Sequence, residues 1–498
     1  MNVAHLLLRG RDVAAGAAAW RYGERSAAYS TLIDRAARLA AGLARTGLRP
    51  GDRVVIDLPN SPDLLEMLWA CFWGGYVAVP VNWHLHPKEV AHVTDDCAAS
   101  AILLGDQTGY HADALRSGVH VIGAGGIPLD DVLADTGSTL WEVSGEEPAW
   151  LFYTSGTTGR PKGATLSHRN LLAMTLNYYA DLDQVAPGSV FVHAAPLSHG
   201  SGLYLLPATG HGATNVIAAT TSFDPVTFLD LVGAVRATHV AFLAPTMLNR
   251  LVAATQPTDP RLADLRSVVV GGAPFYREDL IRAQECVGPI ITQMYGQGEA
   301  PMTISVLPPA EATEVHFASC GRPFTGVALR VIDPLGRDLP TGTSGEVAVR
   351  GDVVMSGYWN NPDATSETLR GGWLHTGDVG HVDDGGYLYL TDRAKDVIMT
   401  GGSNVYPREV EEVLLSYPGV REVAVIGEPD PEWGEAICAV VVLEPDIEVD
   451  AAELVSHCRG HLASFKKPRR VVFTDELPKN ATGKVLKRDL RLEMAGRP

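Results

Sequence analysis

The sequence predicts an α/β fold divided into two or more domains, on three observations. With 498 residues, the chain exceeds the size of an ordinary single core. Short apolar runs typical of buried strands alternate with segments of helical periodicity, as in a parallel sheet covered by helices on both faces. The 51 glycines and 32 prolines supply the many turns that such a chain needs.

The first part of the chain shows this alternation most clearly. A helix is expected over residues 31–46, because apolar residues recur there at helical spacing. Ser61 followed by Pro62 is typical of a helix start. The strands expected from the apolar runs cover residues 54–58, 76–79, 240–243 and 267–270.

The pattern changes after about residue 320. Alternating polar and apolar residues at 327–332 and 345–350 predict the strands of a small β-rich unit. Beyond Lys395 the pattern predicts a compact α+β unit of domain size. Its expected elements are a helix at 407–415, strands at 422–426 and 436–443, a helix at 451–462 and a strand at 470–473.

Charge and cysteine usage exclude several classes of function. The formal net charge of −18 disfavours binding to nucleic acids or to anionic membranes, which requires a basic surface. The six cysteines lack the spacing of a zinc site and are expected to be thiols. The sequence shows neither a secretory signal pattern nor an apolar run of membrane-spanning length. We therefore expect a cytoplasmic protein without an integral membrane segment.

The most informative segment is the loop at residues 153–163. It combines glycines, hydroxyl side chains and the cations Arg160 and Lys162 within eleven residues. Exposed backbone N–H groups beside hydroxyls and a lysine suit a polyphosphate. The spacing differs from the Walker pattern, so the loop indicates a nucleotide site of another kind. The apolar residues 150–152 predict that the loop follows a buried strand.

This loop resembles the phosphate loop of the adenylate-forming superfamily, which includes acyl-CoA synthetases, luciferases and adenylation domains. Further segments follow in that family's order along nearly the whole chain. They are Gly272-Ala273-Pro274, Tyr295-Gly296-Gln297-Gly298-Glu299, Gly345-Glu346, the run from Trp373 to Asp378, the run from Asp392 to Asp396, and the run from Pro478 to Lys484.

The resemblance implies both the domain plan and the reaction. It places an ATP- and acyl-binding domain of αβα layered sheets at residues 1–391, with its β-rich subdomain at about 320–391. A hinge follows at 392–396, and a small mobile α+β domain at 397–498. The implied reaction joins a small carboxylic acid to coenzyme A through an acyl-adenylate, with ATP and Mg²⁺ as cofactors. Positioning and charge neutralisation dominate such catalysis.

The resemblance also assigns the nucleotide-binding residues. Those expected around the phosphates are Thr154, Ser155, Gly156, Thr157, Thr158, Gly159 and Lys162. Those expected around the adenine and ribose are Gly272, Ala273, Pro274, Tyr295, Gly296, Gln297, Asp378 and Arg393. Thr154 and Glu299 are expected to bind Mg²⁺, a hard cation that prefers oxygen ligands.

The remaining residues concern catalysis and the acid. The resemblance gives Lys484 as the adenylation lysine, Lys395 as the hinge position, and Gly401 and Gly402 as part of the coenzyme A tunnel. His199 matches the gate between that tunnel and the acyl pocket. The residues expected to form the pocket are His199, Gly200, Gly271, Met294 and Met302.

Two positions depart from the family pattern. Gly298 replaces the threonine that usually donates to the α-phosphate, so that donor is missing or is supplied by Gln297 or a loop residue. Met294 stands where many relatives have glycine, which predicts a shorter or narrower pocket. The expected substrate is an aryl or short-to-medium aliphatic monocarboxylate.

Three alternatives stay open at this point. A stand-alone adenylation enzyme that loads the phosphopantetheine of an acyl carrier protein would share every adenylation motif. Luciferase-like oxidation of the adenylate is a second alternative. A nucleotide-binding protein without catalysis is a third, although Lys484, Glu299 and Asp378 argue against it. The sequence leaves the oligomeric state open, with a homodimer as one option.

Overall fold

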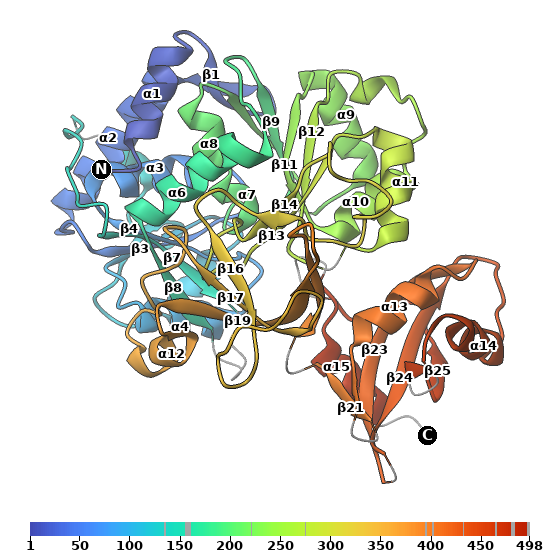
Figure 1. Ribbon diagram of the computed structural model, residues 1–498. Helices are drawn as coiled ribbons and strands as arrows, with labels where there is room; N and C mark the ends of the chain where they lie inside the picture. Colours follow the sequence, from blue (N-terminus) through green and yellow to red (C-terminus); the bar gives the residue numbers. More distant parts are fainter. Residues whose placement is uncertain are drawn as a thin grey trace.

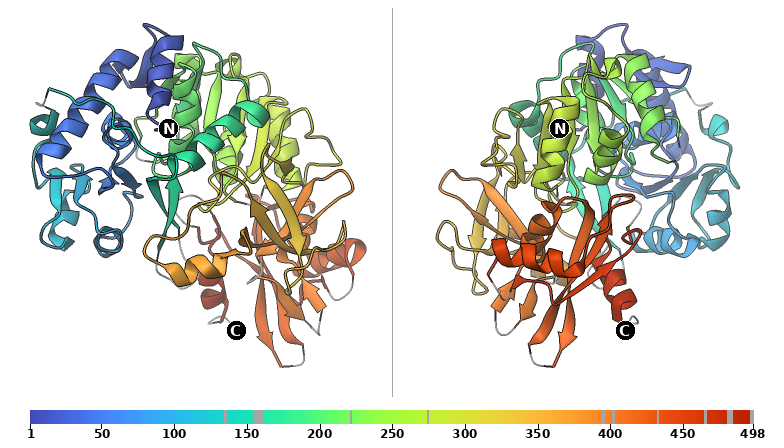
Figure 2. Two further views of the ribbon diagram at one scale, coloured as in Figure 1. Left: turned by 60° about the vertical axis from the view of Figure 1, so that its left-hand side comes forward. Right: turned by 90° about the vertical axis from the view of Figure 1, so that its right-hand side faces the viewer.

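The computed structural model describes residues 1–133, 136–154, 161–220, 222–273, 275–393, 396–400, 403–431, 433–463, 466–479 and 484–495. A large body carries two extended sheets, and a smaller unit at the C-terminal end packs beside it (Figures 1 and 2). The α/β fold class is therefore confirmed.

The larger sheet has nine strands in the order β15-β14-β13-β12-β11-β9-β10-β1-β2. Its middle is parallel, and the pairs β1–β2, β13–β14 and β14–β15 are antiparallel. The strands are β1 (Ala18–Tyr22), β2 (Arg25–Ala28), β9 (Val190–His193), β10 (Thr214–Ile217), β11 (His239–Leu243), β12 (Ser267–Val270), β13 (Ile291–Tyr295), β14 (Ser305–Leu307) and β15 (Arg322–Pro323).

The second sheet has six strands in the order β6-β5-β3-β4-β7-β8. Its neighbouring strands run parallel, except that β7 and β8 pair antiparallel. The expected layered sheets are thus present, and each of the two large sheets is mixed rather than wholly parallel. The strands are β3 (Arg53–Asp57), β4 (Val77–Pro80), β5 (Ala101–Leu104), β6 (His120–Gly123), β7 (Pro148–Thr154) and β8 (Lys162–Ser167).

Helices fill the space between the two sheets and cover their outer faces. One core cluster joins α2 and α3 to residues of both sheets, including Trp20 of β1 and Trp150 of β7. The helices of the large body are α1 (His5–Val13), α2 (Tyr29–Arg45), α3 (Pro62–Gly74), α4 (Pro87–Asp96), α5 (Leu129–Leu133), α6 (His168–Asn177), α7 (Gly200–Leu203), α8 (Leu205–Gly210), α9 (Pro225–Val235), α10 (Pro245–Ala253), α11 (Arg277–Val287) and α12 (Pro362–Thr368).

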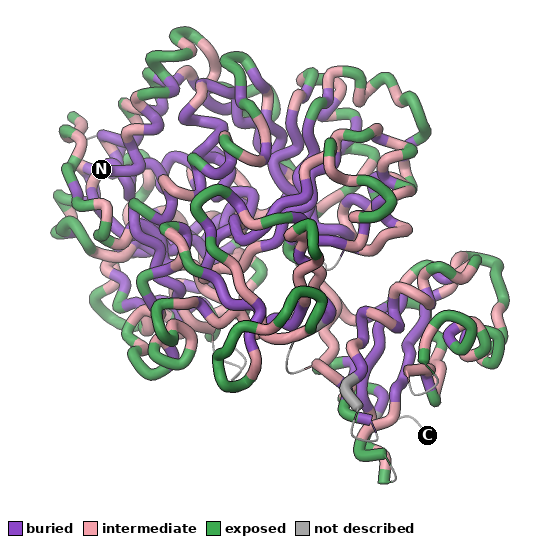
Figure 3. The backbone as a smooth tube through the Cα atoms, viewed as in Figure 1, coloured by how far each residue is buried: buried purple, intermediate pink, exposed green. Residues whose placement is uncertain are grey.

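Helix α3 shows how the sequence directs this layering. Ser61 caps its first turn by accepting from the Leu64 amide, and Pro62 begins the helix, as predicted. Nearly every residue from Pro62 to Trp73 is buried, the pattern of a helix enclosed on all sides. Figure 3 shows the same burial along the central strands of the large body.

Two smaller sheets complete the chain. The first has the order β16-β17-β19-β18 with β20 beside β19, and its strands are β16 (Ala328–Ile332), β17 (Gly345–Arg350), β18 (Leu369–Arg370), β19 (Trp373–Val382) and β20 (Leu388–Arg393). The second belongs to the C-terminal unit and consists of β21 (Ile398–Thr400), β22 (Ser403–Val405), β23 (Val420–Asp430), β24 (Gly434–Leu443) and β25 (Arg470–Phe473). The helices of that unit are α13 (Pro407–Leu415), α14 (Ala451–His461) and α15 (Lys487–Ala495).

Candidate active site

The predicted site residues lie at the carboxyl ends of parallel strands, the usual ligand position in an open α/β sheet. Segments 194–199, 271–273 and 296–302 follow β9, β12 and β13 of the nine-stranded sheet. The β7–β8 hairpin enters from the six-stranded sheet, and β19 from the β-rich one. The site therefore forms where three sheets meet.

Asp378 stands at the centre of the predicted ribose site. Its side chain is buried, and its Oδ2 accepts a hydrogen bond from the Tyr295 hydroxyl at 2.5 Å. The Gln297 amide donates to the same oxygen at 2.5 Å and to the carbonyl of Thr376 at 3.0 Å. Burial, with the Asp378 charge as a second cause, raises the pKa of Tyr295 well above its usual value. The phenol therefore stays protonated and holds the carboxylate in place.

Glu299 lies within reach of two hydroxyl groups. The Tyr358 hydroxyl donates to Glu299 Oε1 at 2.6 Å, and the Thr154 hydroxyl donates to the same atom at 3.4 Å. These oxygen groups fit a magnesium ion, which is commonly held by one or two carboxylates together with water and substrate phosphates. Within the described ranges no cluster of three or more His, Cys, Asp or Glu side chains could hold a metal. A Mg²⁺ ion at Glu299 would also take oxygen ligands from the phosphates of ATP.

The structure explains why Gly298 occupies the threonine position. A Cβ at residue 298 would lie 2.5 Å from the Thr154 methyl group and 2.7 Å from the Phe152 ring. Both amide contacts of Gln297 go to β19, so Gln297 does not replace the missing donor. Phe152 and Thr154 of β7 instead fill the space that a threonine side chain at position 298 would need.

His199 precedes α7 and faces that same strand. Its ring meets the Phe152 ring edge-on, with the centroids 5.5 Å apart, and its Nδ1 lies 2.9 Å from the Ser198 hydroxyl. Burial of the ring lowers the pKa of His199 to about 4. The imidazole is therefore neutral at pH 7.

Two methionines lie against the glycines of the predicted acyl pocket. The Met302 methyl group is 2.7 Å from the place that a Cβ at Gly200 would take. Met302 itself adopts a left-handed backbone conformation with φ of 62°, which is strained for a residue other than glycine. The Met294 sulfur occupies the space above Gly271, and the side chain is 4% exposed. Met302 and Met294 therefore fill the space that the absent side chains of Gly200 and Gly271 leave open.

Other predicted residues are placed less directly. The backbone of Arg393 pairs with Asp378 across β19 and β20, and the Lys162 ammonium lies 5.3 Å from the centre of the Tyr358 ring. Lys484 follows β25, in a turn closed by a bridge between Lys479 and Val485. Several predictions concern residues outside the described ranges, namely Ser155, Gly156, Thr157, Thr158, Gly159, Pro274, Lys395, Gly401 and Gly402.

Gly272, Ala273 and Gly296 are three described residues of the set expected around the adenine and ribose. Gly272 has a φ of 83°, and a Cβ there would lie 3.3 Å from the Phe242 ring. A Cβ at Gly296 would approach the Met302 backbone to 2.6 Å. These two glycines permit the close packing of the loops after β12 and β13.

The sequence did not single out Phe152 or Tyr358. Phe152 reads as part of an apolar strand, and Tyr358 as one aromatic residue in a polar segment. Phe152 contacts His199 and Gly298, and Tyr358 contacts Glu299. These partners are far apart in the chain, so no local sequence pattern around Phe152 or Tyr358 predicts the contacts.

Comparison with known proteins places this site in a family. Residues 11–359 match the model described as AMP-binding enzyme, and residues 409–484 match the AMP-binding enzyme C-terminal domain. A feruloyl-CoA synthase of an Amycolatopsis species is 40% identical over 481 residues, which is 95% of each chain. The fatty acid–[acyl-carrier-protein] ligase ScoC of Streptomyces coeruleorubidus is 35% identical over 94% of this chain and 91% of ScoC. ATP-bound MatB from Rhodopseudomonas palustris matches with a TM-score of 0.89 at 32% identity, covering 100% of this chain and 99% of MatB.

The fold and these matches define an adenylate-forming enzyme. The chain belongs to the AMP-binding enzyme family, and it is an AMP-forming acid–CoA ligase that uses ATP, Mg²⁺ and coenzyme A. The resemblance stated from the motifs is thereby confirmed.

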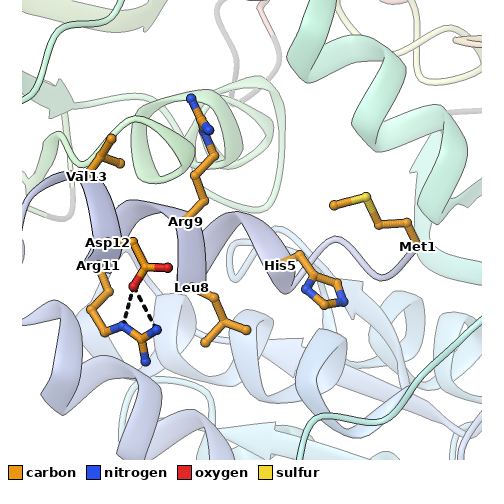
Figure 4. A pocket seen from close by; sticks show the side chains of 7 residues that line it. All are labelled: Met1, His5, Leu8, Arg9, Arg11, Asp12 and Val13. Atoms are coloured by element: carbon orange, nitrogen blue, oxygen red, sulfur yellow. Dashed lines mark hydrogen bonds and ion pairs between the residues drawn. The ribbon is translucent and has the colours of Figure 1, made fainter.

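Two features lie outside the site. A surface depression is lined by Met1 and by residues of α1, namely His5, Leu8, Arg9, Arg11, Asp12 and Val13, and Figure 4 shows that Arg11 pairs with its neighbour Asp12 there. Across the residues that the structure describes, no helix is long and apolar enough to cross a membrane.

Proposed function

We propose that the acid is a monocarboxylate with an aryl or short-to-medium apolar tail. The observation that carries this proposal is the character of the side chains around the predicted pocket. Met294, Met302 and Phe242 lie against its glycines, and His199 beside them is neutral at pH 7. Such a lining favours an uncharged tail over a second carboxylate, because an unpaired buried charge is costly. The similarity to a feruloyl-CoA synthase supports an aryl acid.

Each side chain then has a defined task. Asp378 fixes the ribose through a carboxylate that Tyr295 and Gln297 already orient. Glu299 and Thr154 would hold Mg²⁺ beside the phosphates. Lys484 would neutralise charge between the acid and the α-phosphate, where a mobile point charge is effective. Bound ATP supplies the adenylyl group and the pyrophosphate leaving group.

We further propose that the small domain alternates between two orientations about residues 392–396, with domains at 1–391 and 397–498. One pocket can then serve both half-reactions. The separate sheets β16–β20 and β21–β25 support a boundary between them. In this scheme Lys484 serves adenylation, and Gly401 and Gly402 serve thioester formation. Lys395→Pro, which fixes φ at the pivot, should spare adenylate formation and reduce transfer to coenzyme A. Equal activity of this variant in both steps would show that Lys395 is not the pivot.

The substrate is tested by pyrophosphate release with a panel of acids. Aryl and medium-chain monocarboxylates should be turned over, and dicarboxylates of equal length should react at least tenfold more slowly. A preference for a dicarboxylate would contradict the proposal.

A second series of the same assay tests which thiol accepts the acyl group from the adenylate. Coenzyme A is the acceptor expected of an acid–CoA ligase, and the similarity to ScoC makes an acyl carrier protein the additional acceptor to be tested. Each acceptor is supplied at equal concentration with the best acid, and thioester formation is measured directly. A cytoplasmic location and a homodimer stay predictions, which cell fractionation and light scattering test.

A further inference from the structure

Tyr358 connects two parts of the site that are remote in sequence. Its segment runs beside β8, the strand that leaves the phosphate loop. The Trp359 amide donates to the Gly163 carbonyl at 2.8 Å, and the Thr165 amide donates to the Gly357 carbonyl at 2.9 Å. The backbone around Tyr358 is thus fixed relative to β8.

The Tyr358 hydroxyl fixes the second part. It donates to Glu299 Oε1 at 2.6 Å, while the Thr154 contact with the same oxygen is longer, at 3.4 Å. The amide of Met355, three residues before Tyr358, also donates to the Glu299 carbonyl at 2.8 Å. The 355–358 segment therefore holds both the backbone and the carboxylate of Glu299.

The ring of Tyr358 also contacts the loop lysine. The Lys162 ammonium lies 5.3 Å from the ring centre, within the range of a cation–π interaction. One side chain thus contacts both the Glu299 carboxylate and the Lys162 ammonium group.

We propose that Tyr358 is a positioning residue for the metal ligand. By occupying Oε1, its hydroxyl turns Glu299 so that Oε2 is presented to the divalent cation that accompanies ATP. This inference rests on the proposed metal-binding role of Glu299. Hydrogen-bonded partners of a ligating carboxylate orient it in this way in many metal sites.

A purely structural role predicts something different. Tyr358 and Glu299 are both partly exposed, so water can replace the hydroxyl contact in a Phe variant. Tyr358→Phe should therefore unfold at nearly the wild-type temperature and keep the ring beside Lys162. The proposal instead requires a specific change in the response to Mg²⁺.

The test measures binding without turnover. Calorimetric titration of α,β-methylene-ATP at several Mg²⁺ concentrations gives the Mg²⁺ concentration for half-maximal binding. In Tyr358→Phe that concentration should rise about 10–100-fold, the usual effect of removing a partner of a metal ligand. Binding of AMP without Mg²⁺ should not change.

Tyr387→Phe is the matched control. Tyr387 directly precedes β20, and its hydroxyl donates to the Glu311 carboxylate at 3.0 Å, away from the predicted site residues. A Mg²⁺ response in Tyr358→Phe no larger than in Tyr387→Phe would overturn the proposal.

Glu299→Gln separates this inference from the proposed function. If Glu299→Gln binds the nucleotide with unchanged Mg²⁺ dependence, Glu299 is not the ligand and the inference fails. Adenylate formation by the wild-type protein with an apolar monocarboxylate would still support the proposed function in that case.

Discussion

Arg408 of the small domain donates a hydrogen bond to the carbonyl of Phe275 in the large domain, at 3.0 Å. The guanidinium is buried, lies over the Tyr276 ring and pairs with Glu412 at 3.5 Å. The Tyr276 hydroxyl in turn donates to Glu411 at 2.9 Å. This contact joins the C-terminal unit to the segment between β12 and α11 of the large body.

Replacing Arg408 should release the small domain. Arg408→Met removes the buried cation that donates to the Phe275 carbonyl and pairs with the partly exposed Glu412, and a hydrogen bond to a charged group contributes about 1.5–3 kcal/mol. We expect a lower melting temperature and a larger radius of gyration by small-angle scattering. Arg236→Met, which removes an exposed pair with Asp264, is the control. If both variants behave alike, the Arg408 contact does not hold the domains together.

His193 should make the protein sensitive to acid. Its ring is fully buried between Ser201 and Asn215, and burial lowers its pKa to about 4 from 6.5. A lowered histidine pKa contributes stability that is complete above pH 6.5 and is lost as the pH falls toward 4. The difference between these pKa values corresponds to roughly 3 kcal/mol.

The measurement is the free energy of unfolding from pH 7 to pH 4. His193→Gln should lose less stability over this range than the wild type, since a neutral amide replaces the imidazole. His120→Gln, at an exposed position on β6, should follow the wild-type curve. A His193→Gln curve parallel to the wild type would refute the assignment.

Lys484→Ala should impair one half-reaction selectively. Loss of a preorganised charge donor costs roughly 10²–10³-fold in rate, so adenylate formation should fall by this factor. Thioester formation from supplied acyl-adenylate should change much less. Lys479, which pairs with Glu422 in the same turn, provides the control Lys479→Ala. Equal losses in both half-reactions would rule out the role of Lys484.

Met294→Gly should enlarge the acyl pocket. The Met294 side chain covers Gly271, so its removal opens space at the end of β12. Discrimination by a few buried methylene-sized contacts amounts to about 10–200-fold, and kcat/KM should shift by up to this factor toward longer acids. Competition between a short and a long acid measures the ratio. An unchanged ratio, or an effect confined to ATP binding, would place Met294 outside the pocket.

Gly298→Thr should not restore the usual family contact. The new side chain would meet Thr154 and Phe152, and overpacking of this kind costs about 1–3 kcal/mol. We expect lower thermal stability and slower adenylation. The double variant Phe152→Ala/Gly298→Thr should recover part of the stability, because the ring is the larger obstacle. A single variant that is stable and faster would show that the missing hydroxyl limits the enzyme.

Local sequence patterns predicted many elements well. Helix α13 covers residues 407–415 and β25 covers 470–473, as expected, and β17 matches residues 345–350. These elements have clear periodicity and sharp proline or glycine boundaries. The division of the strands into two mixed sheets was not predicted, because periodicity reports burial and does not specify which strand lies beside which.

The sequence by itself determined the family, the class of reaction and the identity of the chemical groups, because loop composition and motif order are local properties of the chain. The tertiary structure decided which of these groups meet. Tyr358 reaches Glu299 from 59 residues away, and Phe152 lies against both His199 and Gly298. Such pairs depend on the order of strands in three sheets. That order is fixed by burying the whole core at once, so no local pattern reveals it.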